Sequence, residues 1–166
     1  MRNFRTSSRG GAIVELALVA VALFVLVFGM VDYGRALLAR HAITSLSREA
    51  ANLASRGTSF ADTLQATLQS SGSLDLSTNG FVILSAVTRD ENGVLRVVRQ
   101  ESAGGRPAPS RIGTVGGGLV VVPNGVPLPG QTLYVSEVSV DFTEVTPISS
   151  LIGVRIPSSL YDVAYF

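Results

Sequence analysis

One uninterrupted apolar run, at residues 12–31, constrains this chain more than any other feature. It reads AIVELALVAVALFVLVFGMV, and Glu15 is its only charged residue. At about 1.5 Å per residue, a helix of this length extends roughly 30 Å, which is the thickness of the hydrocarbon core of a bilayer. The run therefore predicts a transmembrane helix over residues 11–31, with most of the chain outside the membrane.

The charges before the run predict its orientation. Arg2, Arg5 and Arg9 precede it, and no acidic residue comes before Glu15. Because such cations stay in the cytoplasm, the remainder of the chain should be periplasmic or extracellular. A cleaved secretory signal is the alternative, but it has a shorter apolar core followed by a small-x-small site. The nearest match, Ala-Val-Ala at residues 20–22, lies inside the run, which favours a retained helix.

Glu15 is unusual because a carboxylate in a spanning helix is costly at the bilayer centre and less costly near the interface. By its position alone, Glu15 could equally be an interfacial acid near Arg9 or a functional residue. However, Gly10 and Gly11 follow the basic leader, residues 1–10. A cut between these two glycines would make Glu15 the fifth residue of the mature chain and would create a new ammonium group at Gly11.

This arrangement resembles the class III signal of type IV pilins. In that family a prepilin peptidase cuts on the cytoplasmic side and leaves the apolar helix attached. The resemblance implies that Gly10 and Gly11 form the processing site, and that Glu15 offsets the Gly11 ammonium of a neighbouring subunit. Either charge alone would be expensive in an apolar bundle, so the pair would favour one axial register. Gly11 departs from the bulky apolar first residue of many major pilins.

Three segments carry a wider resemblance: RGGAIVELAL at residues 9–18, FGMVDYGRAL at 28–37 and REAA at 48–51. They look like the opening of TadE-like proteins, the pseudopilins of the tight-adherence (Tad) pilus machinery. A weaker similarity lies at residues 135–142, with Pro147 and residues 151–153 behind it. Ala50 and Asn52 depart from the Gly and Arg that are frequent in this family.

The resemblance implies a non-catalytic pseudopilin or minor pilin that is a component of Tad-type pilus assembly or secretion. Its partners would be the membrane, other pilins or pseudopilins, a prepilin peptidase and, indirectly, the assembly platform and its ATPase. The chain would cross the inner (cytoplasmic) membrane once or reside in a surface pilus. Two alternatives stay open: an uncleaved membrane-anchored envelope protein, and a surface-binding module that is not incorporated in a filament.

Beyond the apolar run, at residues 32–57, the pattern becomes that of an amphipathic helix. Its apolar stripe comprises Ala39, Ile43, Leu46, Ala50 and Leu53, whereas Arg40, Ser47 and Arg48 lie off it. Gly57 follows Arg56 as a helix stop, so one helix over residues 12–56 is predicted. His41 should lie at a surface or interface.

Gly29, Asp32 and Gly34 mark the membrane boundary of this helix. In pilin-like proteins, glycines at this place let the helix bend or melt locally, which would make the boundary a hinge. Glycine is also ordinary in spanning helices, and this second interpretation needs no hinge.

Residues 58–166 should form an extracytoplasmic α+β domain. Ser59, with Asp62 three residues later, can cap a short helix. Strands are predicted at residues 81–88, 94–101 and 133–143. In the third, Val138 and Val140 alternate with Glu137, so one face should pack and the other should meet water. The predicted fold class is α+β and pilin-like, with the long helix against a small antiparallel sheet.

Residues 103–118 contain six glycines and two prolines, a composition typical of a weakly structured region without a packed element. A linker and a loop displayed for a partner both fit this composition. Residues 119–122 could add a short edge strand.

The residue inventory excludes several classes of function. The chain has no Cys and one His, and its 13 cationic residues are all Arg. Disulfides, thiolate chemistry and multi-His metal sites are therefore excluded, and so are Ser or Cys nucleophiles that need a nearby base. A net charge of +1 gives no support to a nucleic-acid binder. The acidic pairs Asp90/Glu91 and Glu137/Asp141 should be exposed, so no enzyme activity, cofactor or metal is expected.

Overall fold

The computed structural model describes residues 8–106, 108–117, 120–146, 153 and 157–166. The chain divides into two compact units. The first, the membrane unit, comprises Met1–Ala36 and Glu144–Ile156. The second, the sheet unit, comprises Leu37–Thr143 and Pro157–Phe166.

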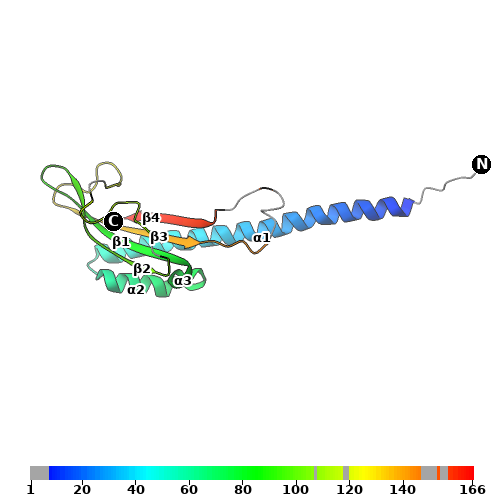
Figure 1. Ribbon diagram of the computed structural model, residues 1–166, viewed down its shortest axis with the longest axis horizontal. Helices are drawn as coiled ribbons and strands as arrows, with labels where there is room; N and C mark the ends of the chain where they lie inside the picture. The colour runs from blue at the N-terminus through cyan, green and yellow to red at the C-terminus, as the bar shows by residue number, and fades with distance from the viewer. Residues whose placement is uncertain (1–7, 107, 118–119, 147–152, 154–156) are drawn as a thin grey trace, which may run out of the picture. The chain divides into compact units, whose positions relative to one another are not determined.

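Helix α1 (Ser8–Ser55) is continuous and runs through both units (Figure 1). It confirms the long helix that the sequence predicts. The stop signal is also confirmed, because Gly57 takes a left-handed φ of 91°. At this helix end the Gly57 N–H donates to the carbonyl of Ala54, and the Thr58 N–H donates to that of Leu53. Glycine adopts this backbone conformation without the steric cost that a side chain would add.

Three short helices follow in the sheet unit: α2 (Phe60–Ser70), the 3₁₀ helix η1 (Gly72–Leu74) and α3 (Leu76–Asn79). The predicted cap of α2 is confirmed, since Ser59 Oγ accepts a hydrogen bond from the Asp62 N–H at 3.1 Å. Ser59 also donates to the Asp62 carboxylate at 2.6 Å. This pair satisfies one of the donors that every helix N-terminus leaves unpaired.

Four strands form one antiparallel sheet: β1 (Gly80–Arg89), β2 (Leu95–Gly104), β3 (Thr132–Asp141) and β4 (Ser159–Tyr165). Their order is β2-β1-β3-β4. The α+β class and the antiparallel arrangement are confirmed, but the sheet has four strands, whereas three were expected. Strand β4, next to the chain end, is the addition, and it pairs with β3 along seven positions. Residues 120–122 form no strand, and Leu119 lies outside the described residues.

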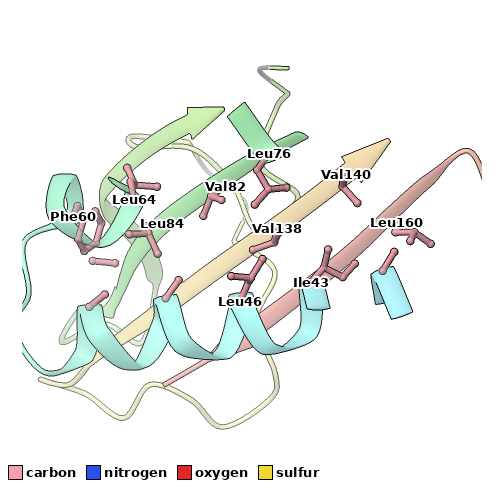
Figure 2. Close-up of a cluster of buried hydrophobic side chains, with 14 residues drawn as sticks. Ile43, Leu46, Phe60, Leu64, Leu76, Val82, Leu84, Val138, Val140 and Leu160 are labelled. Atoms are coloured by element: carbon pink, nitrogen blue, oxygen red, sulfur yellow. The ribbon is translucent and has the colours of Figure 1, made fainter. Parts of the chain in front are cut away.

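One face of the sheet packs against the C-terminal half of α1 and against α2 (Figure 2). The side chains that meet there include Ile43, Leu46, Phe60, Leu64, Leu76, Val82, Leu84, Val138, Val140 and Leu160. The predicted stripe of α1 is buried up to Ala50, after which Ala54 rather than Leu53 takes the buried place. Ser47 was expected off the stripe, but it is fully buried and donates to Asp162 Oδ2 of β4 at 2.6 Å.

The second face of β3 was expected to meet water, and this prediction was wrong. The connection between β2 and β3 covers it, with Ile112 only 2% exposed and Val120 and Val122 half-buried. Glu137, placed on this face by the alternation of β3, is 1% exposed. The expectation of no packed element in residues 103–118 is likewise corrected: residues 103 and 104 belong to β2, and Ile112 joins a second apolar cluster.

Candidate membrane and assembly site

The N-terminal part of α1 is apolar and exposed over its whole surface. Of the helices in the described part of the chain, this one is long and apolar enough to cross a membrane, with a mean hydropathy of 2.8 in its most apolar window. None of that window is buried inside the protein. An exposed apolar surface of this length requires an apolar environment, which a lipid bilayer provides. The helix is thus consistent with single-pass membrane anchoring.

Gly10, Gly11 and Glu15 all lie on the exposed surface of this segment. A Cβ atom added to either glycine would meet no other atom within 4 Å. Because α1 begins at Ser8, the bond between the two glycines lies in the first helical turn. The N–H groups of a first turn have no intrahelical acceptors, so this turn opens more easily than any later one. Glu15 follows Gly11 by one turn, about 6 Å along the axis.

At the boundary, α1 stays helical through Gly29, Asp32 and Gly34. Asp32 is buried, and its carboxylate accepts hydrogen bonds from the N–H groups of Val145 and Thr146, both at 3.1 Å, and from the Thr146 hydroxyl. Arg35 adds an ion pair at 3.8 Å. The hydrogen bond from the Thr146 hydroxyl, helped by these weaker contacts, lowers the pKa of Asp32 despite the opposing effect of burial.

A second buried carboxylate, Glu137, lies in the sheet unit. It accepts hydrogen bonds from the Arg111 N–H at 2.8 Å, the Tyr161 hydroxyl at 2.7 Å and the Ser110 hydroxyl. The Arg111 guanidinium stacks 4.0 Å from the centre of the Tyr161 ring. Burial, and then the hydrogen bond to Glu137, raise the pKa of Tyr161. The carboxylate thus fixes residues 110 and 111 of the long connection onto the sheet, which is a structural role.

Within the described part of the chain, no group of three His, Asp or Glu side chains could hold a metal ion. His41 is exposed on α1, as expected. Of the other acids considered, Glu91 is exposed, Asp90 accepts from the Val94 N–H in the hairpin between β1 and β2, and Asp141 pairs with Arg106.

Comparison with known proteins finds a family that is similar to part of this chain. Residues 10–52 match the model of a family described as TadE-like protein. We call this segment, which is similar to that family, the TadE-like segment. No match was found among curated proteins or among solved structures.

The TadE-like segment is about a quarter of the chain and lies entirely within α1. It contains all six residues that the sequence singles out: Gly10, Gly11, Glu15, Gly29, Asp32 and Gly34. The acceptor role of Asp32 towards Val145 and Thr146 was not predicted. Its partners lie more than a hundred residues away, outside the TadE-like segment, and no local pattern points to them.

Proposed function

We propose that this chain is a pseudopilin or minor pilin of a Tad-type pilus, a non-catalytic membrane component of its assembly or secretion machinery. Two observations together carry the proposal. Residues 10–52 match the TadE-like family, and the exposed apolar run has one carboxylate, Glu15, four residues after the Gly10–Gly11 pair. A simple membrane anchor has no need of a carboxylate at this place, because an apolar residue would insert at lower cost.

Processing would occur between Gly10 and Gly11. Both residues are exposed, and only the first turn of α1 would have to open for a peptidase to reach the bond between them. Removal of residues 1–10 leaves the apolar helix intact and places an ammonium group at its N-terminus. The class of enzyme that suits this site is a prepilin peptidase acting on the cytoplasmic side.

Glu15 would then act in assembly. In a bundle of apolar helices its carboxylate would meet the Gly11 ammonium of a neighbouring subunit, because neither charge can stay unpaired in a medium of low dielectric constant. Such pairing selects one axial register between helices that otherwise slide freely past one another. Other pilins are thus the direct partners, and the platform and its ATPase are the indirect ones.

The remaining assignments follow from this topology. The N-terminus would be cytoplasmic, and the sheet unit would lie outside the inner membrane, in the periplasm or on a surface pilus. Gly29 and Gly34 would flank the place where the helix leaves the bilayer, and Asp32 would mark that boundary.

The mass of the mature chain tests processing. We expect a chain that begins at Gly11 when the protein is produced with its prepilin peptidase, and one that begins at Met1 without it. A chain that keeps Met1 in both cases contradicts the proposal and favours an uncleaved envelope anchor.

Glu15→Gln tests assembly, with Glu49→Gln as the matched control because Glu49 is an exposed acid on the same helix. We expect the Glu15 variant to insert and to be cleaved, but to enter filaments at least about tenfold less than the wild type, since an unpaired buried charge costs several kcal/mol. The Glu49 variant should assemble normally. Equal incorporation of the Glu15 variant and the wild type would rule out the charge-pairing role.

A further inference from the structure

A short segment of the membrane unit, residues 144–146, is tied to α1 where the apolar run ends; we call it the strap. Asp32, the first residue after that run, accepts the N–H groups of Val145 and Thr146 and the hydroxyl of Thr146. These hydrogen bonds place the backbone of the strap beside the last turn of the apolar helix. The strap therefore lies at the depth at which α1 passes from lipid to water.

The side chains presented at this place are apolar and aromatic. Val145 is 67% exposed although its own N–H is bound to Asp32. Tyr33, the residue after Asp32, is 62% exposed. Tyrosine is enriched where membrane proteins cross the lipid headgroups, because its ring is apolar and its hydroxyl is polar. The exposed side chain of Val145, whose N–H is bound to Asp32, the residue before Tyr33, gains free energy only if it leaves water.

The charge arrangement also suits a lipid surface. The Asp32 carboxylate is buried under the strap, so it does not face the headgroups. Arg35 lies one turn further along, with its side chain 46% exposed, and its guanidinium offsets the Asp32 charge at 3.8 Å. The Asp32 charge is thus shielded and Glu144, the acid of the strap, is half-buried, whereas the side chains of Val145 and Tyr33 are exposed.

We propose that the strap is a membrane-surface contact, in which Asp32 holds residues 144–146 so that Val145 inserts beside Tyr33 into the interface between headgroups and acyl chains. The inference rests on the membrane-spanning role of α1 in the proposed function. It adds a second lipid contact, more than a hundred residues after Asp32 in sequence.

The chain contains no Trp, so one introduced tryptophan is an unambiguous reporter. The full chain carrying Val145→Trp is placed in vesicles of phosphatidylcholine and phosphatidylglycerol, with lipids brominated near the top of the acyl chains. We expect bromine to remove about half of the fluorescence or more, because interfacial side chains sit roughly 5–10 Å into the headgroup and acyl boundary. Iodide in the water should quench this tryptophan less than a soluble tryptophan analogue.

Three further variants make the result decisive. Phe24→Trp, in the middle of the apolar run, reports on the span alone. Asp32→Ala combined with Val145→Trp releases the strap and should return the reporter to water, with loss of the lipid quenching and recovery of iodide quenching. Thr146→Val is a milder release that removes the hydroxyl donor and keeps the backbone donors.

The outcomes separate the two proposals. If lipid quenches Phe24→Trp but iodide alone quenches Val145→Trp, the strap does not contact the membrane, whereas the span stands. If Val145→Trp is shielded from both quenchers, protein covers the strap and the lipid contact is refuted. If lipid fails to quench Phe24→Trp, the membrane role of α1 fails, and the strap contact fails with it.

Discussion

Replacement of Glu137 by alanine should open the long connection between β2 and β3 near Arg111. In the native protein the Glu137 carboxylate accepts the Arg111 N–H and the hydroxyls of Ser110 and Tyr161, and it is 1% exposed. Alanine leaves the N–H of Arg111, next to the buried Ile112, without its acceptor. The two hydroxyls lose their partner as well, although Tyr161 is half-buried and can turn towards water.

The size of the effect follows from these contacts. Glu137 accepts three hydrogen bonds, and each hydrogen bond to a charged group contributes about 1.5–3 kcal/mol. Part of this loss is offset, because removal of the carboxylate also removes its own desolvation cost. We therefore expect a net loss of about 3 kcal/mol from the free energy that holds residues 110–112 on the sheet. Because each 1.4 kcal/mol is a factor of ten, the open population should rise roughly a hundredfold.

Limited trypsin digestion of the full chain measures this opening directly. Trypsin cuts after Arg, and the bond from Arg111 to Ile112 is protected because Ile112 is 2% exposed. When opening and closing are fast relative to cleavage, the cutting rate follows the open population, so it should rise by the same factor.

Glu101→Ala is the matched control, because Glu101 is a strand glutamate whose partner, Arg99, lies at 2.6 Å on the exposed surface. Surface pairs contribute about 1 kcal/mol or less, so the rate at Arg111 should change by less than about fivefold. Glu137→Gln keeps one acceptor oxygen and should give an intermediate rate. If Glu137→Ala is cut at Arg111 no faster than the wild type, the carboxylate does not hold the connection.

Three more outcomes are expected. Ile43→Ala, at a fully buried position of α1, should lower the free energy of unfolding by about 2–5 kcal/mol, which a shift of the urea midpoint would reveal; an unchanged midpoint would refute the packing of α1 on the sheet. Gly105→Ala should lower the thermal midpoint more than Gly93→Ala, because a Cβ at Gly105 overlaps two backbone carbonyls of α3, whereas a Cβ at Gly93 meets no atom and costs only the strain of its left-handed φ of 80°; the reverse order would contradict this close approach. Docking of the strap should be complete above pH 3.8, the ordinary value for an Asp carboxyl, and should be lost as the pH falls through the lowered pKa of Asp32. A pH titration of the strap tryptophan would show this transition, and Asp32→Asn should abolish it.

Local patterns predicted the elements that depend on near neighbours in the chain. The apolar run and the stripe up to Ala50 predict α1, because a helix repeats every 3.6 residues and must bury one face or enter lipid. Ser59 and Asp62 predict the start of α2, since a cap involves residues three apart. The Gly-Gly pair and Glu15 were found in the same way, as one short motif in register.

The prediction for the exposed face of β3 failed because alternation does not say what covers a strand. Glu137 alternates with valines like an ordinary surface acid, but the connection that buries it has no hydrophobic period of its own. Its glycines and prolines are typical of a loop, and in its described part Ile112, Val120 and Val122 give it an apolar side. Whether such a loop lies in water or on a sheet depends on contacts between residues far apart in sequence.

The sequence by itself determined the apolar helix, the single charge of its apolar run and the α+β class of the rest of the chain, because each depends on the spacing of neighbouring residues. Only the tertiary structure decided that β4 completes the sheet, that Glu137 is buried, and that Asp32 binds a strap 113 residues away at Val145. The physical reason is that a buried carboxylate is stable only where several donors converge on it, and these donors are brought together by the fold of the whole chain.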